Sequence, residues 1–151
     1  MQMVNVQIQL ACQIDIPDLV SLLNHCARDM HQQGMSHWLN VYDEQSVKQN
    51  LLQKTVYVLK QKSQLIGCVA LGVQPASYYT DCWPQAPDAD FYLTQLAIHP
   101  QHQQSGYGRF LLQYCLELTE GRTLQLDAVA HYPELLKFYR QSGFKQIAEG
   151  I

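Results

Sequence analysis

The sequence has few charged residues, and they form no run of one sign. Charged side chains make up 15% of the 151 residues, and the formal net charge is −3. Nucleic acids are bound chiefly through clustered Lys and Arg, so this balance argues against a nucleic-acid partner. The chain also has no apolar run of the roughly 20 residues that span a membrane, and its first residues lack the basic and apolar regions of a signal peptide.

Cysteine and histidine occur without the spacings of disulfide frameworks or metal sites. The five cysteines are an odd number, and no two of them have C-x-x-C spacing. The six histidines form no H-E-x-x-H motif. We therefore expect free thiols, a cytoplasmic location, no metal and no membrane partner.

The apolar pattern predicts a single mixed α/β domain over residues 1–151. Hydrophobic residues make up 47% of the chain, enough for one sizeable core. Segments rich in β-formers predict about six strands, at 4–10, 55–60, 65–73, 91–98, 124–129 and 144–148. Apolar residues at helical spacing predict four flanking helices, at 15–34, 43–54, 109–120 and 133–141.

The segment between the strand at 91–98 and the helix at 109–120 carries two glycines. It reads Gln103-Gln104-Ser105-Gly106-Tyr107-Gly108-Arg109. Glycine permits positive φ and close ligand approach, and the N–H groups at a helix start attract anions such as pyrophosphate. Neither a P-loop G-K-[ST] nor the third glycine of G-x-G-x-x-G is present. An ordinary strand-to-helix turn is the alternative interpretation.

Two segments of the chain together resemble the GNAT N-acetyltransferase superfamily. The first, Leu96-Ala97-Ile98-His99-Pro100 leading into Gln103-x-x-Gly106-x-Gly108, is similar to motif A. The second runs from Leu126-Asp127 to Phe138-Tyr139 and Gly143-Phe144 and is similar to motif B. The order and spacing agree from about residue 4 to residue 148, and the likeness is to the bacterial members that act on small substrates.

This resemblance implies a GNAT-like fold and acetyl-CoA as co-substrate. The pyrophosphate would lie on backbone N–H groups between Gln104 and Arg109. The pantetheine arm would pair with Leu96 to Ile98, where that strand splays from the strand at 124–129. Gln103 would steady the loop. The implied cofactor-binding residues are Leu96, Ala97, Ile98, Gln103, Gln104, Ser105, Gly106, Tyr107, Gly108 and Arg109.

Tyr139 matches the position that protonates the departing CoA thiolate in many family members. A phenol with a pKa of about 10 can donate a hydrogen bond to that thiolate and pass it a proton. The alternative is that Tyr139 packs as a core aromatic residue, as Phe138 beside it does.

The sequence does not identify a general base as directly as it identifies Tyr139. Many family members place a carboxylate on the motif A strand, but residues 91–96 of this chain contain none. Asp90 is the first candidate, and Asp127 and His131 are others. A water molecule oriented by Thr94 or Gln95 is an equal alternative.

Aromatic residues in two loops predict where the acceptor binds. Trp38 lies in the loop at 35–42, and Tyr79 and Trp83 lie in the loop at 75–90. Aromatic rings with nearby carboxylates suit a small cationic amine. The alternative is that the two tryptophans only fasten the loops to the core.

We therefore predict an acetyltransferase that moves an acetyl group from acetyl-CoA to a small primary amine, by direct transfer in a ternary complex. A CoA-binding module without catalysis is the alternative. Many family members carry a seventh strand after the position of Phe144, and only seven residues follow it here. Such a strand is either absent or supplied by a second subunit, because an open sheet edge favours a homodimer.

Overall fold

The computed structural model describes residues 5–128 and 133–147. The helices and strands, in chain order, are β1 (Val6–Leu10), α1 (Ile16–Gln32), α2 (Glu44–Gln53), β2 (Thr55–Gln61), β3 (Gln64–Gly72), α3 (Tyr79–Cys82), β4 (Phe91–Ile98), α4 (Tyr107–Leu118), β5 (Leu124–Gln125) and α5 (Pro133–Gln141). Two 3-10 turns, η1 (Gln13–Asp15) and η2 (Pro100–His102), precede α1 and follow β4.

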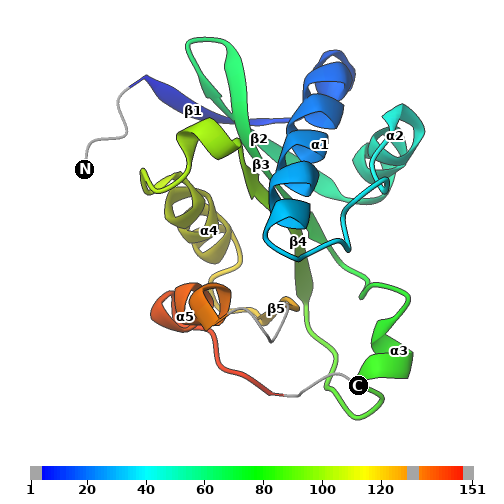
Figure 1. Ribbon diagram of the computed structural model, residues 1–151. Helices are drawn as coiled ribbons and strands as arrows, with labels where there is room; N and C mark the ends of the chain where they lie inside the picture. The colour runs from blue at the N-terminus through cyan, green and yellow to red at the C-terminus, as the bar shows by residue number, and fades with distance from the viewer. Residues whose placement is uncertain (1–4, 129–132, 148–151) are drawn as a thin grey trace.

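The strands form one mixed sheet with helices on both faces. The strand order is β1-β2-β3-β4-β5, and only the β4–β5 pair is parallel. The helices α1 and α2 lie on one side of the sheet and α4 on the other, with α5 beside β5 (Figure 1). This arrangement confirms the predicted α/β class.

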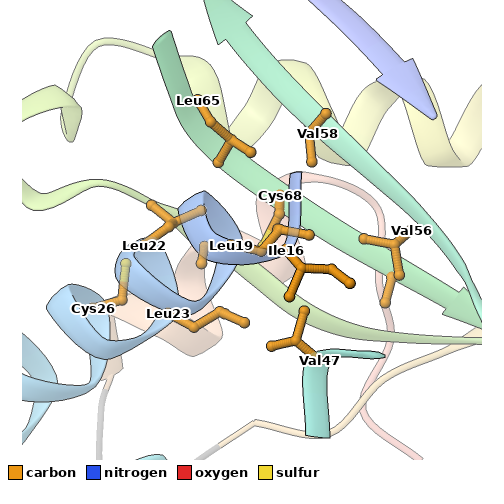
Figure 2. Close-up of a cluster of buried hydrophobic side chains, with 12 residues drawn as sticks. Ile16, Leu19, Leu22, Leu23, Cys26, Val47, Val56, Val58, Leu65 and Cys68 are labelled. Carbon is orange, nitrogen blue, oxygen red and sulfur yellow. The ribbon is translucent and has the colours of Figure 1, made fainter. Parts of the chain in front are cut away.

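The core on the α1 side follows from the apolar spacing of that helix. Figure 2 shows side chains of α1 directed at β2 and β3, with Val47 of α2 beside them. Leu19, Leu22 and Leu23 are each at most 2% exposed. Because they recur three or four residues apart, one helical face buries all of them.

The core on the α4 side depends on one glycine in β3. Leu111, Leu112 and Cys115 of α4 are completely buried against the sheet. A Cβ on Gly67 would lie 2.7 Å from Ile98 Cδ1 and 3.3 Å from Leu111 Cδ1. Glycine at this position therefore allows α4 to pack closely on β3 and β4.

Strand β4 loses its second neighbour after two residues. It pairs with β5 only through Phe91–Leu124 and Tyr92–Gln125, whereas its pairing with β3 continues to Ile98. The register with β3 shifts between Cys68 and Ala70, opposite Gln95, whose φ is +57°. Such a bulge bends a strand and redirects its backbone groups. The splay that the sequence predicted is therefore present.

Several predicted boundaries need correction. Helix α4 begins at Tyr107 rather than 109, because Gly106, with φ +86°, starts the helix two residues earlier. The loop predicted at 75–90 contains the one-turn helix α3. Strand β5 has two residues, and the described residues 144–147 form no strand, so the described part of the chain has five strands rather than about six. Val4, Val129 and Ala148, at the ends of predicted strands, lie outside the described residues.

A buried ion pair joins the start of α1 to β2. Asp15 is 3% exposed, and its carboxylate lies 2.8 Å from the Lys60 ammonium. The same carboxylate accepts a 2.9 Å hydrogen bond from the Cys12 N–H group. Burial alone raises the pKa of Asp15, but the hydrogen bonds from Lys60 and Cys12 outweigh it and hold that pKa below its ordinary value.

Asp15→Asn is expected to lower the free energy of unfolding at pH 7 by about 2 kcal/mol, because it removes charged hydrogen bonds. A lowered pKa in the folded state stabilises above the unfolded-state pKa, about 3.9, and this stabilisation is lost as the pH falls through the folded-state pKa. Urea unfolding at pH 7 and pH 3 should therefore show a difference that shrinks in acid. Equal stabilities at pH 7 would contradict the prediction, and Glu117→Gln, at an exposed position on α4, is the control.

Candidate functional site

The loop before α4 presents unpaired backbone N–H groups. Gly106 caps the helix with φ +86°, and Gln104 also has a positive φ, +63°. Within the described residues, the N–H groups of Gly106 to Arg109 donate no hydrogen bond. These N–H groups lie at the start of a helix, which carries a partial positive charge. The segment is therefore built to hold an anion without a cationic side chain.

Side-chain hydrogen bonds fasten this loop to the sheet. Gln103 Nε2 donates to the carbonyl oxygen of Ile98 at 3.0 Å, and the Cys26 thiol donates to the same oxygen at 3.2 Å. Gln61 Nε2 donates to the Tyr107 hydroxyl at 3.3 Å. The contact from Gln103 is the one that its predicted role in steadying the loop requires.

The end of β4 offers backbone groups beside the loop. The His99 N–H group donates to the Ile66 carbonyl of β3 at 2.8 Å. Because backbone groups alternate in direction along a strand, those of Leu96 and Ile98 point away from β3. No pairing with β5 reaches these residues. Ala97 and Ile98 bury their side chains on opposite faces of the sheet. Because the Ile98 carbonyl already accepts bonds from Gln103 and Cys26, an extended ligand would pair with the Ile98 N–H group and the backbone of Leu96.

Tyr139 lies in an aromatic cluster on α5. Its ring packs against Phe138 and Phe144 with centroid distances of 5.2 Å and 5.9 Å. Burial, with a smaller effect of the Asp127 charge, raises the pKa of Tyr139 to about 12. The Tyr139 hydroxyl therefore remains protonated at neutral pH. Phe138 Cζ lies 3.7 Å from where a Cβ on Gly108 would be, so α5 packs close to the start of α4.

A pocket of about 660 Å³ lies between α3, β5 and α5. Its walls include Tyr79, Trp83, Asp127 and Tyr139. The Trp83 indole N–H group is buried without a hydrogen-bond partner among the described residues. A second hollow, of about 550 Å³, lies along β1 and the β2–β3 turn and contains no predicted site residue. The first pocket thus brings together Tyr139, the predicted catalytic tyrosine, and two of the three predicted acceptor residues.

Trp38, the third predicted acceptor residue, lies elsewhere. Its ring packs edge-on against Tyr42 with a centroid distance of 5.6 Å, within the core cluster on the α1 side. Trp38 therefore packs against the core and does not line the pocket.

Asp90 joins the beginnings of β4 and β5. Its Oδ2 accepts hydrogen bonds from the Thr123 N–H group at 2.9 Å and from the Thr123 hydroxyl at 3.1 Å. These bonds hold the pKa of the exposed Asp90 carboxyl below its ordinary value. A carboxylate stabilised in this way is a weak base, and its contacts fit a structural role. His131, another candidate base, lies outside the described residues.

Comparison with known proteins identifies the family. The model of the acetyltransferase (GNAT) domain matches residues 52–146. The chain belongs to the GNAT acetyltransferase family. The match covers the loop, the end of β4 and Tyr139. Comparison with curated protein sequences gives no match.

Solved structures share the fold of this GNAT acetyltransferase at low sequence identity. A GNAT-family acetyltransferase from Streptococcus agalactiae has a TM-score of 0.80 and 16% identity, covering 96% of this chain and 88% of the other. The ribosomal-protein-S18-alanine N-acetyltransferase from Escherichia coli has a TM-score of 0.70 and 18% identity, covering 95% and 79%. An aminoglycoside acetyltransferase from an uncultured soil sample, in complex with sisomicin, has a TM-score of 0.67 and 17% identity, covering 96% and 93%.

Sequence reasoning missed three features of the GNAT site. No sequence pattern predicted the left-handed backbone of Gln95, because this region of φ is rare for a residue other than glycine. The Lys54 ammonium donates to Thr94 Oγ1 at 3.2 Å, and burial lowers the pKa of Lys54. Asp127 accepts hydrogen bonds from two tyrosines of the 75–90 loop. The one sequence signal for Asp127 was the position of a carboxylate within the predicted strand at 124–129.

The described residues contain neither a helix suited to crossing a membrane nor three His, Cys, Asp or Glu side chains grouped to hold a metal.

Gly106→Ala is expected to weaken acetyl-CoA binding about tenfold, because a residue with a Cβ strains at φ +86° and the loop shifts its N–H groups. Gly121→Ala is the matched control, since it places the same strain at φ +81° outside the loop and its added Cβ has nothing within 4 Å. Isothermal titration with acetyl-CoA measures both. Equal affinities for Gly106→Ala and the unchanged protein would refute the role of the loop.

Proposed function

We propose that this GNAT acetyltransferase transfers the acetyl group of acetyl-CoA directly to a primary amine of a small molecule. The observation that carries the proposal is the unpaired N–H segment at Gly106 to Arg109, fastened through Gln103 to the open edge of β4. A pyrophosphate fits the first feature and an extended amide-bearing arm fits the second. When bound, acetyl-CoA supplies a thioester whose carbonyl carbon is open to attack by an amine.

Tyr139 stabilises the negative charge that develops on the departing sulfur. Its pKa of about 12 keeps the hydroxyl protonated and able to donate. It is a weaker acid than a thiol, whose pKa is about 8.5, so complete proton transfer from Tyr139 to the thiolate is unfavourable. We therefore assign Tyr139 a hydrogen bond to the departing sulfur. The thiolate takes up a proton as the nitrogen of the new amide loses one.

A water molecule accepts the first proton of the acceptor ammonium group. The Thr94 hydroxyl already accepts a hydrogen bond from Lys54, so its own hydrogen is available to orient that water. The Asp90 carboxylate, by contrast, accepts two hydrogen bonds from Thr123. Water near Thr94 and Gln95 is therefore better supported as the base than Asp90, the first candidate from the sequence.

The pocket supports a small acceptor. Its volume of about 660 Å³ falls in the range of small-molecule sites. The two relatives named for their substrates differ, since one acts on an aminoglycoside and the other on an alanine of a ribosomal protein. Both share this fold, so the fold does not distinguish a small-molecule acceptor from a protein acceptor. The proposal of a small molecule therefore rests on the pocket. A cytoplasmic location and a homodimer stay predictions.

The expected result is consumption of acetyl-CoA with acetylation of small primary amines, measured as free thiol and by mass of the product. Tyr139→Phe should lower kcat about 100-fold while acetyl-CoA still binds, because only a hydrogen bond to the leaving group is lost. Tyr114→Phe, which alters a tyrosine packed on Tyr57 with a ring distance of 5.3 Å, is the control.

Two outcomes would refute this account. Binding of acetyl-CoA without turnover on any amine would favour a CoA-binding module instead. Turnover on peptide amino termini alone would exclude the small-molecule acceptor. Full kcat in Tyr139→Phe would remove that residue from the mechanism and leave the rest of the proposal standing.

A further inference from the structure

The Asp127 carboxylate is held in place by two tyrosine hydroxyls. Tyr78 donates to Oδ2 at 2.8 Å and Tyr79 donates to Oδ1 at 3.1 Å. Burial and, after it, interaction with Asp127 raise the pKa values of both tyrosines, so the hydroxyls stay protonated and continue to donate. The orientation of the carboxylate is therefore set before any ligand binds.

The charge of Asp127 has no cationic partner among the described residues. The ion pair that those residues form is between Lys60 and Asp15, far away on β2 and η1. Arg122, Arg140 and Lys145 also line the pocket, but none lies within 4 Å of the Asp127 carboxylate as an ion pair. A half-buried carboxylate without a counter-ion favours binding a cation.

Asp127 has both the capacity and the surroundings to take an ammonium group. Each carboxylate oxygen accepts one tyrosine hydroxyl, which leaves further lone-pair directions free. Tyr79 is fixed by edge contacts with Trp83 at 4.9 Å and Tyr92 at 5.7 Å, and aromatic faces attract cations. Tyr78, Tyr79 and Trp83 thus form an aromatic wall beside the negative charge.

The reaction limits which ammonium group this can be. A carboxylate that binds an ammonium group stabilises its protonated form, and a protonated amine cannot attack a thioester. A nitrogen that stays paired with Asp127 is therefore not the one that is acetylated. The Asp127 charge also acts on Tyr139, so both residues serve the same pocket.

We propose that Asp127, oriented by Tyr78 and Tyr79, binds a second, non-reacting ammonium group of the acceptor. The substrates of this enzyme are then diamines and other polyamino compounds rather than monoamines. This inference rests on the proposed function and adds the substrate class. It requires no proton transfer at Asp127, which is a binding residue.

Matched substrates test the proposal directly. We compare 1,4-diaminobutane with butylamine, which has the same carbon chain and lacks the second charge. The unchanged enzyme should have a higher kcat/KM for the diamine, by about 10- to 100-fold, the contribution of a charged hydrogen bond. Asp127→Asn should remove this preference by raising KM for the diamine, with little effect on butylamine.

Three further variants and a folding check complete the test. Glu120→Gln removes one negative charge from the same pocket and should keep the preference. Asp127→Glu should restore part of it, because the charge returns. Thermal unfolding and titration with acetyl-CoA show whether Asp127→Asn is folded; Tyr79→Phe, which keeps Asp127, should raise KM for the diamine to a smaller extent.

The outcomes separate this proposal from the one on which it rests. Acetylation of both amines with equal kcat/KM, or a preference that survives Asp127→Asn in a folded protein, overturns the second-ammonium site and leaves the acetyltransferase intact. Failure to acetylate either amine or any other small amine overturns both.

Discussion

The parting of β4 from β5 after the Tyr92–Gln125 pair is the constraint on which the site depends. A parallel strand pair normally continues along its length, and its backbone groups are then satisfied by the neighbour. Here the bulge at Gln95 bends β4, and β5 ends after two residues. The edge of Leu96 to Ile98 therefore has no β5 partner, while β3 still pairs with β4 on the other side.

The proposed cofactor site uses backbone N–H groups rather than charged side chains, so a mildly acidic protein can bind an anionic cofactor. The pyrophosphate is assigned to backbone N–H groups at the start of α4, which carry only partial charges. In the pocket, two tyrosine hydroxyls donate to the Asp127 carboxylate and orient it. On the proposed assignment, the partial positive charge of the helix start and this carboxylate direct the anionic cofactor and a cationic acceptor to different places.

The sequence was most informative where local rules apply. Apolar spacing located α1 and α4. The pattern of Gln103 and Gly106 located the loop, because the conformational freedom of glycine and the N–H groups at a helix start depend on only a few neighbouring residues. The bulge at Gln95 and the hydrogen bonds to Asp127 were not predictable, since Tyr78 and Asp127 are 49 residues apart and meet only in the folded chain. For the same reason Trp38 and Trp83 were grouped together, although the fold separates them.

Amide hydrogen exchange with and without acetyl-CoA tests the central claim, that the cofactor binds through backbone groups of the α4 start and the β4 edge. The account predicts slower exchange at Gly106 to Arg109 and at Leu96 and Ile98, because these N–H groups have no β5 or helix partner in the free protein. Slower exchange confined to other segments, such as β1 and the β2–β3 turn, would contradict it.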